Sequence, residues 1–184
     1  MKKIVLTFGL LSGAVASVMM VSTMLNMDRI GFDKAIFVGY TAIVVSMLFI
    51  FFGIRSYREN VGGGTISFGK AFAVGILITL ISTVFYVVTW EILYFKFLPD
   101  FADKCLAYAV EEVRASGAGQ AAVDAKLQEM KDLKVMLNNP LLNAAFTFIE
   151  PFPVGLIITL ISAAILRKKN PTAPMPAPSE AATG

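Results

Sequence analysis

Long apolar runs alternate with short polar segments along this chain, and four of the runs have the length of a membrane helix. A bilayer core of about 30 Å is crossed by about 20 residues at the helical rise of about 1.5 Å per residue. Each run therefore predicts one membrane-spanning α-helix, and together they predict an all-α bundle of four transmembrane helices. The runs are Ile4–Leu25, Ala35–Ile54, Ala71–Leu98 and Ala144–Leu166.

The pattern changes between the third and fourth runs, where charged residues alternate with apolar ones at helical spacing. Two amphipathic stretches are separated by Ser116–Gly119, whose glycines favour a break, and the second ends at Asn138-Asn139-Pro140. We expect a helical hairpin outside the membrane over about residues 99–139. Its predicted apolar stripes are Phe101, Cys105, Leu106, Ala109, Val110 and Val113, followed by Val123, Leu127, Met130, Leu133 and Leu137.

The positions of the basic residues agree with a single orientation of the four spans in the membrane. Basic residues precede the first run, separate the second from the third, and follow the fourth. The positive-inside rule places these basic segments in the cytoplasm. We therefore expect a multi-pass protein of the bacterial inner membrane with both termini cytoplasmic and the hairpin outside. The residues are Lys2, Lys3, Arg55, Arg58, Lys70, Arg167, Lys168 and Lys169, of which the last six are expected to contact lipid headgroups.

The two ends of the chain need separate interpretation. Ala14-Val15-Ala16 resembles a signal-peptidase site, but the apolar run continues to Met27, which favours a first helix that is retained. Cleavage would leave the direction of the other three spans unchanged. Residues 1–169 are thus predicted to form the membrane domain. The Pro/Ala-rich residues 170–184 have no core-forming pattern and predict a disordered cytoplasmic tail.

Composition supports the membrane class and narrows the chemistry. The chain is 57% hydrophobic and 16% charged, with a mean hydropathy of +0.72. Its net charge of +3 comes from basic residues at helix ends, so we expect no nucleic-acid partner. Histidine is absent and Cys105 is the single cysteine, which excludes His/Cys zinc sites, Ser–His triads and an internal disulfide. We expect no metal, no cofactor, no catalytic residue and no enzymatic activity.

Small residues recur every four positions on three of the predicted spans. Such stripes let helix backbones approach closely in a membrane. They favour tight packing within one bundle, with homo-oligomerisation through the same faces as the alternative. The stripes are Gly9, Gly13 and Ser17; Ala71, Gly75, Thr79 and Thr83; and Gly155, Thr159 and Ala163.

Two carboxylates, Glu91 and Glu150, stand in strongly apolar surroundings. At the helical rise they lie about 31 Å above Lys70 and about 25 Å above Arg167, so both belong to the outer part of the membrane. One interpretation is a pair that coordinates a proton or cation. The other places Glu91 at the interface in an aromatic belt with Trp90 and Tyr94, and Glu150 at the start of a helix begun by Pro151.

Several segments resemble a bacterial integral-membrane family, the domain of unknown function DUF4199. They are the opening residues 1–13, Ile-Phe-Phe-Gly-Ile-Arg-Ser-Tyr-Arg at 50–58, Ile-Ser-Phe-Gly-Lys-Ala-Phe at 66–72, and Trp90-Glu91. The resemblance covers residues 1 to about 170, outside the middle of the hairpin. It supports the topology, and the family's name implies no activity that can be transferred to this chain.

The functional class that these observations favour is a non-enzymatic scaffold or interaction protein of the bacterial envelope. Its expected partners are the lipid bilayer and another membrane or envelope protein. The alternative is a small transporter or ion-coupled membrane component that uses Glu91 and Glu150. An intramembrane enzyme ranks third, because no nucleophile–base pair is visible.

Overall fold

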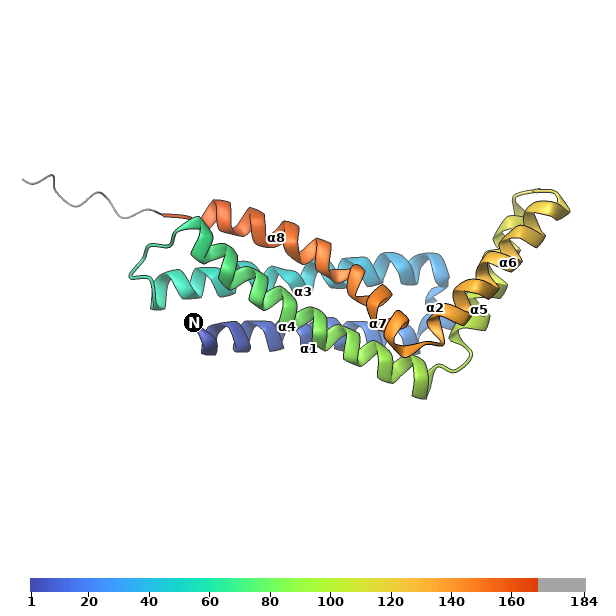
Figure 1. Ribbon diagram of the computed structural model, residues 1–184, viewed down its shortest axis with the longest axis horizontal. Coiled ribbons are helices and arrows are strands. Elements are labelled where there is room, and N and C mark those ends of the chain that lie inside the picture. The colour runs from blue at the N-terminus through green and yellow to red at the C-terminus, as the bar shows by residue number, and fades with distance from the viewer. Residues whose placement is uncertain (169–184) are drawn as a thin grey trace, which may run out of the picture.

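The computed structural model describes residues 1–168, and every regular element in this range is helical. Lys169 and the predicted disordered tail, residues 170–184, lie outside the described residues. Figure 1 shows long helices lying side by side, with the helical hairpin leaning away from one end of the bundle. The elements are α1 (Lys2–Leu25), α2 (Met27–Ile30), α3 (Phe32–Asn60), α4 (Phe68–Ile92), the π-helical turn η1 (Leu93–Phe97), α5 (Phe101–Ala115), α6 (Gln120–Leu137), α7 (Pro140–Ile149) and α8 (Pro151–Leu166).

Four helical stretches of the described chain are long and apolar enough to cross a membrane. This confirms the predicted fold class and suggests a multi-pass membrane protein. The end of the bundle where α1 starts and α8 ends is called the basic end here, because it carries the basic residues named above; the opposite end is the hairpin end (Figure 1). The stretches are Lys2–Leu25, Phe32–Asn60, Phe68–Phe97 and Pro140–Leu166.

The small-residue stripes are used inside the bundle. A Cβ on Gly9 would lie 2.8 Å from the side chain of Ile81, and one on Gly13 would lie 2.7 Å from Phe85, so α1 packs directly on α4. Gly75 of α4 approaches Thr159 of α8 in the same way. The predicted tight packing within one chain is therefore confirmed. Homo-oligomerisation through these faces stays a prediction.

Buried hydroxyl groups join the same helices. Ser12 of α1 donates to the main-chain oxygen of Ser46 at 2.8 Å and shares a hydrogen bond of 2.9 Å with the hydroxyl of Ser82. The hydroxyls of Thr79 and Thr159 lie 3.1 Å apart in the α4–α8 contact. Polar groups in an apolar bundle must find partners within the protein, so these bonds define how the helices face one another.

The predicted hairpin is present as α5 and α6, which pack on each other. Val110 and Val123 of the two apolar stripes are 6% and 4% exposed. The turn between the helices contains Gly117 at φ 77°, a left-handed conformation that favours glycine. Lys134 and Asp103 form an ion pair between the helices. The hairpin thus buries its apolar faces against itself.

The fourth span begins earlier than expected and is broken near its middle. It starts at Pro140 rather than at Ala144, because the side chain of Asn139 accepts hydrogen bonds from the main-chain nitrogens of Leu141 and Leu142 at 3.0 and 3.3 Å. The break falls at Glu150, where Pro151 has no N–H to continue α7. Helix α8 packs against both α3 and α4, whereas α7 packs on α4 and makes no comparable contact with α3.

Candidate functional site

A cavity of about 470 Å³ lies at the hairpin end of the bundle. Helix α8 packs against α3 but α7 does not, which leaves space beside α7. The cavity in this space is lined by residues of α1, α3, α4 and α7, together with residues of α5 and the end of α6. Most of the wall is apolar, and a few polar side chains interrupt it, as in typical small-molecule sites. The polar side chains are Tyr40, Tyr86, Trp90, Cys105, Asn143, Thr147 and Glu150.

Glu150 lines this cavity at the break between α7 and α8. The Tyr86 hydroxyl of α4 donates to Oε2 of Glu150 at 3.4 Å. Tyr86 is 9% exposed and therefore buried, whereas Glu150 is exposed at the cavity wall. Glu150 stands out in the sequence as a carboxylate in an apolar segment, whereas Tyr86 does not, because a tyrosine inside an apolar span gives no sign of the direction in which it points.

Asn143 organises the second polar cluster of the cavity and is fully buried. Its Oδ1 accepts from Nε1 of Trp90 at 2.9 Å and from the Thr147 hydroxyl at 3.3 Å. Its Nδ2 donates to the main-chain oxygen of Leu137 at 2.9 Å. The residue thus links α4, α7 and the end of α6. In the sequence, this buried polar site is indicated only by the presence of an asparagine within the apolar segment 141–149.

Trp90 and Tyr94, the candidate aromatic belt, are turned inward at the hairpin end. Trp90 is half-buried, and Tyr94 is 5% exposed. The Trp90 ring centroid lies 5.8 Å from that of Tyr94 and 5.2 Å from that of Phe101 at the start of α5. The two rings therefore pack under the base of the hairpin.

The structure does not bring Glu91 and Glu150 to the same cavity. Glu91 follows Trp90 on α4, about 100° further round the helix, and is not among the residues that line the cavity. Its Oε1 is buried and has no hydrogen-bond partner among residues 1–168. A pair of carboxylates acting in one cavity therefore has no support from the placement of Glu91.

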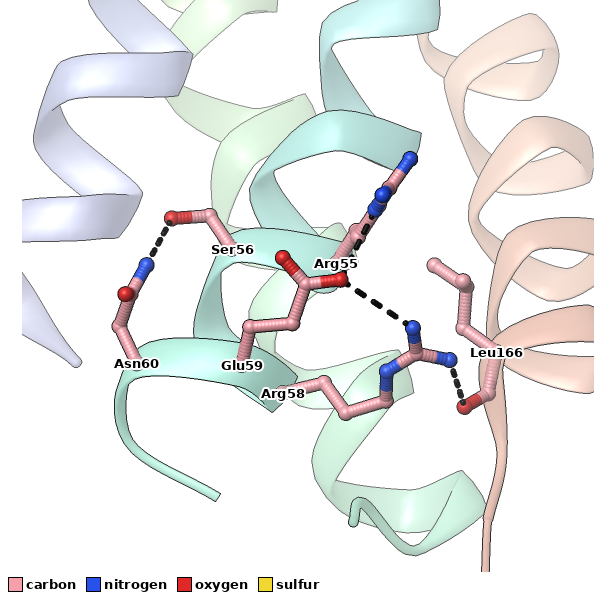
Figure 2. Close-up of polar contacts among 6 residues, drawn as sticks. All are labelled: Arg55, Ser56, Arg58, Glu59, Asn60 and Leu166. Atoms are coloured by element: carbon pink, nitrogen blue, oxygen red, sulfur yellow. Dashed lines mark hydrogen bonds and ion pairs between the residues drawn. The ribbon is translucent and has the colours of Figure 1, made fainter. Parts of the chain in front are cut away.

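The candidate headgroup residues at the basic end make contacts within the protein, which Figure 2 shows. Nε of Arg55 donates to Oε1 of Glu59 at 2.9 Å, and Nη2 of Arg58 reaches the same oxygen at 3.4 Å. Nη1 of Arg58 donates to the main-chain oxygen of Leu166 at 3.5 Å, so this arginine caps the last turn of α8. The Arg58 side chain is 23% exposed, against 54% for Arg55.

The remaining basic residues of the set are on the surface. Lys70, Arg167 and Lys168 are exposed and accessible to lipid headgroups. The main chain of Lys168 also pairs with that of Ile66, through hydrogen bonds of 2.9 and 3.1 Å. Lys169 lies outside the described residues. Headgroup contact by these side chains stays a prediction.

Specific side-chain contacts hold the base of the hairpin to the bundle. Nζ of Lys104 lies 3.1 Å from Asp28 in α2, and the Tyr108 hydroxyl donates to Asp33 at 2.5 Å. The rings of Tyr108 and Phe32 stack with centroids 4.7 Å apart. The hydrogen bond to Asp33 raises the pKa of Tyr108 to about 12. These contacts join residues about 75 positions apart in the chain, and no local sequence pattern indicates them.

Cys105 is half-buried at the cavity wall. Burial raises the pKa of its thiol to about 11, so the group stays protonated and unreactive near neutral pH. Within residues 1–168, no group of three His, Cys, Asp or Glu side chains is placed to hold a metal ion. The expected absence of catalytic, metal and cofactor sites stays a prediction.

Four helical stretches that are long and apolar enough to span a membrane suggest that this helical molecule is a multi-pass membrane protein. Residues 7–168 match the model of a family described as "Protein of unknown function (DUF4199)", and the chain belongs to this family. The match confirms the resemblance seen in the sequence. Comparison with curated proteins gives no match, and comparison with solved structures gives none either.

Proposed function

We propose that this protein is a non-enzymatic interaction protein of the bacterial inner membrane, whose outer hairpin presents a surface to another envelope protein. The observation that carries the proposal is the hairpin itself, which leans away from the bundle while its base is held by side-chain contacts (Figure 1). A hairpin that packs on its own stripes leaves the other faces of both helices free. A fixed base gives those faces a defined orientation.

The exposed faces of the hairpin carry both charged and apolar side chains. Glu111 and Glu112 on α5 and Lys131 on α6 are exposed, and Val135 of α6 is 72% exposed. Mixed surfaces of this kind suit a non-obligate protein contact better than a permanent one, whose buried core is more apolar.

Reporter fusions test the orientation on which the proposal depends. A reporter that is active only in the cytoplasm is expected to work when fused after Lys169, and to fail when inserted at 116–119. The reason is the concentration of positive charge at the basic end. An insertion at Gly63, in the loop between α3 and α4, should behave like the fusion after Lys169. An exported carboxyl terminus would contradict the orientation and the proposed outer surface.

Site-specific photocrosslinking in intact cells tests the interaction surface. A photoreactive residue at Lys131 or Val135 is expected to yield a discrete cross-linked partner, whereas one at Val123, buried between α5 and α6, should yield none. Tyr108→Phe removes the hydroxyl that holds Asp33 and should weaken the cross-links at unchanged protein level. No partner at either exposed position, or the same yield at Val123, would contradict the proposal.

A second candidate is a small transporter or ion-coupled component, and one observation favours it. Glu150 lines the cavity and accepts a hydrogen bond from Tyr86, which is how a carboxylate in a membrane pathway is commonly placed. The position of Glu91 favours a role for Glu150 alone. Proton-driven flux in reconstituted vesicles that is lost in Glu150→Gln but kept in Glu59→Gln would favour transport over interaction.

A further inference from the structure

The charge of the cavity wall comes from a single side chain. Among the described residues that line the cavity, Glu150 is the only Asp, Glu, Lys or Arg. No basic side chain of the wall is therefore present to neutralise its carboxylate. Its hydrogen bond from the Tyr86 hydroxyl is long, at 3.4 Å, and uses Oε2. An uncompensated carboxylate in apolar surroundings favours a cation beside it.

Aromatic rings surround the same space. Tyr40, Tyr86, Trp90 and Phe146 come from α3, α4 and α7, and all four line the cavity with Glu150. The faces of such rings attract organic cations, most strongly when water is excluded. A metal ion or an inorganic cation would instead require several oxygen ligands. The wall therefore fits an organic cation, whose charged centre is surrounded by hydrocarbon groups, better than a metal ion.

The rest of the wall selects for an apolar body. Met20, Met24 and Met27 of α1 and α2 supply flexible, polarizable side chains that adapt to ligands of different shape. Helix α7 packs on α4 and makes no comparable contact with α3, so residues of α3 and α7 face the cavity from different helices.

We infer that the cavity binds a lipophilic organic cation, with the positive charge beside Glu150 among the rings and the apolar body against the methionines. This binding site is additional to the interaction surface of the hairpin and does not depend on it. A lipophilic anion would be repelled by the carboxylate. A neutral lipid chain would gain nothing from Glu150.

Trp90 provides the measurement, because it is the single tryptophan of the chain and lines the cavity. The intact protein in vesicles of neutral phosphatidylcholine is titrated with tetraphenylphosphonium, and Trp90 fluorescence is followed. We expect a saturable change. Glu150→Gln is expected to raise the Kd at least about tenfold, which corresponds to about 1.4 kcal/mol. Tetraphenylborate, of the same shape and opposite charge, should produce no saturable change.

Glu91→Gln is the matched control, since it makes the same change on a carboxylate outside the cavity and should leave the Kd unchanged. An equal loss in both variants would overturn the inference, because the effect would then follow the total charge. Equal responses to the two probes, or an unchanged Kd in Glu150→Gln, would overturn it as well. If Glu150→Gln fails to fold, the comparison of the two probes on the wild-type protein still decides.

Discussion

Gly75→Ala is expected to lower the free energy of unfolding of the bundle by about 1–3 kcal/mol, the usual cost of overpacking. The new Cβ would lie 2.6 Å from Cγ2 of Thr159 and 3.0 Å from Cδ1 of Ile54. Neither neighbour is free to move, because the Thr159 hydroxyl is bonded to Thr79 and Ile54 is fully buried. The measurement is reversible unfolding of the purified protein in mixed micelles.

Two further variants test whether the loss of stability comes from the contact between Gly75 and Thr159. Gly39→Ala adds the same methyl group to a mid-helix position of α3 with no atom within 4 Å, and should be neutral or slightly stabilising. Thr159→Ala removes the methyl group that meets the new Cβ, so the double variant should recover part of the loss. Identical unfolding of Gly75→Ala and Gly39→Ala would show that α4 and α8 are not in close contact.

Asn143→Leu is expected to destabilise the hairpin end by about 1–3 kcal/mol and to change the emission of Trp90. Leucine has a similar size but no amide, so the Trp90 N–H and the Leu137 carbonyl oxygen both lose their partner. Unfolding and the fluorescence of the single tryptophan report the two effects in one sample.

Asn60→Leu serves as the control for this substitution. Asn60 is exposed at the basic end, where its side chain donates to the Ser56 hydroxyl (Figure 2), and water can replace that contact. We expect little change in stability and none in Trp90 emission. Unaltered stability and emission in Asn143→Leu would contradict the buried network.

The sequence predicted the number of spans, the hairpin and its two apolar stripes, because these depend on length, hydrophobicity and spacing along one helix. The ends of the helices were predicted less well. Helix α3 continues past Ile54 to Asn60, since Arg55 and Glu59 sit one turn apart and pair on its last turns. Helix α7 starts at Pro140 because of a cap by Asn139, a local contact that hydropathy does not detect.

The sequence by itself determined that the chain forms four apolar helices, that its basic residues gather at one end, and that Glu91 and Glu150 stand in apolar segments. Only the tertiary structure decided whether these two glutamates share a site. It turns Glu150 toward Tyr86 in the cavity and leaves Glu91 outside it. The physical reason is angular: a residue's direction depends on how its helix is rotated against its neighbours, and small-residue contacts such as Gly75 with Thr159 define that rotation.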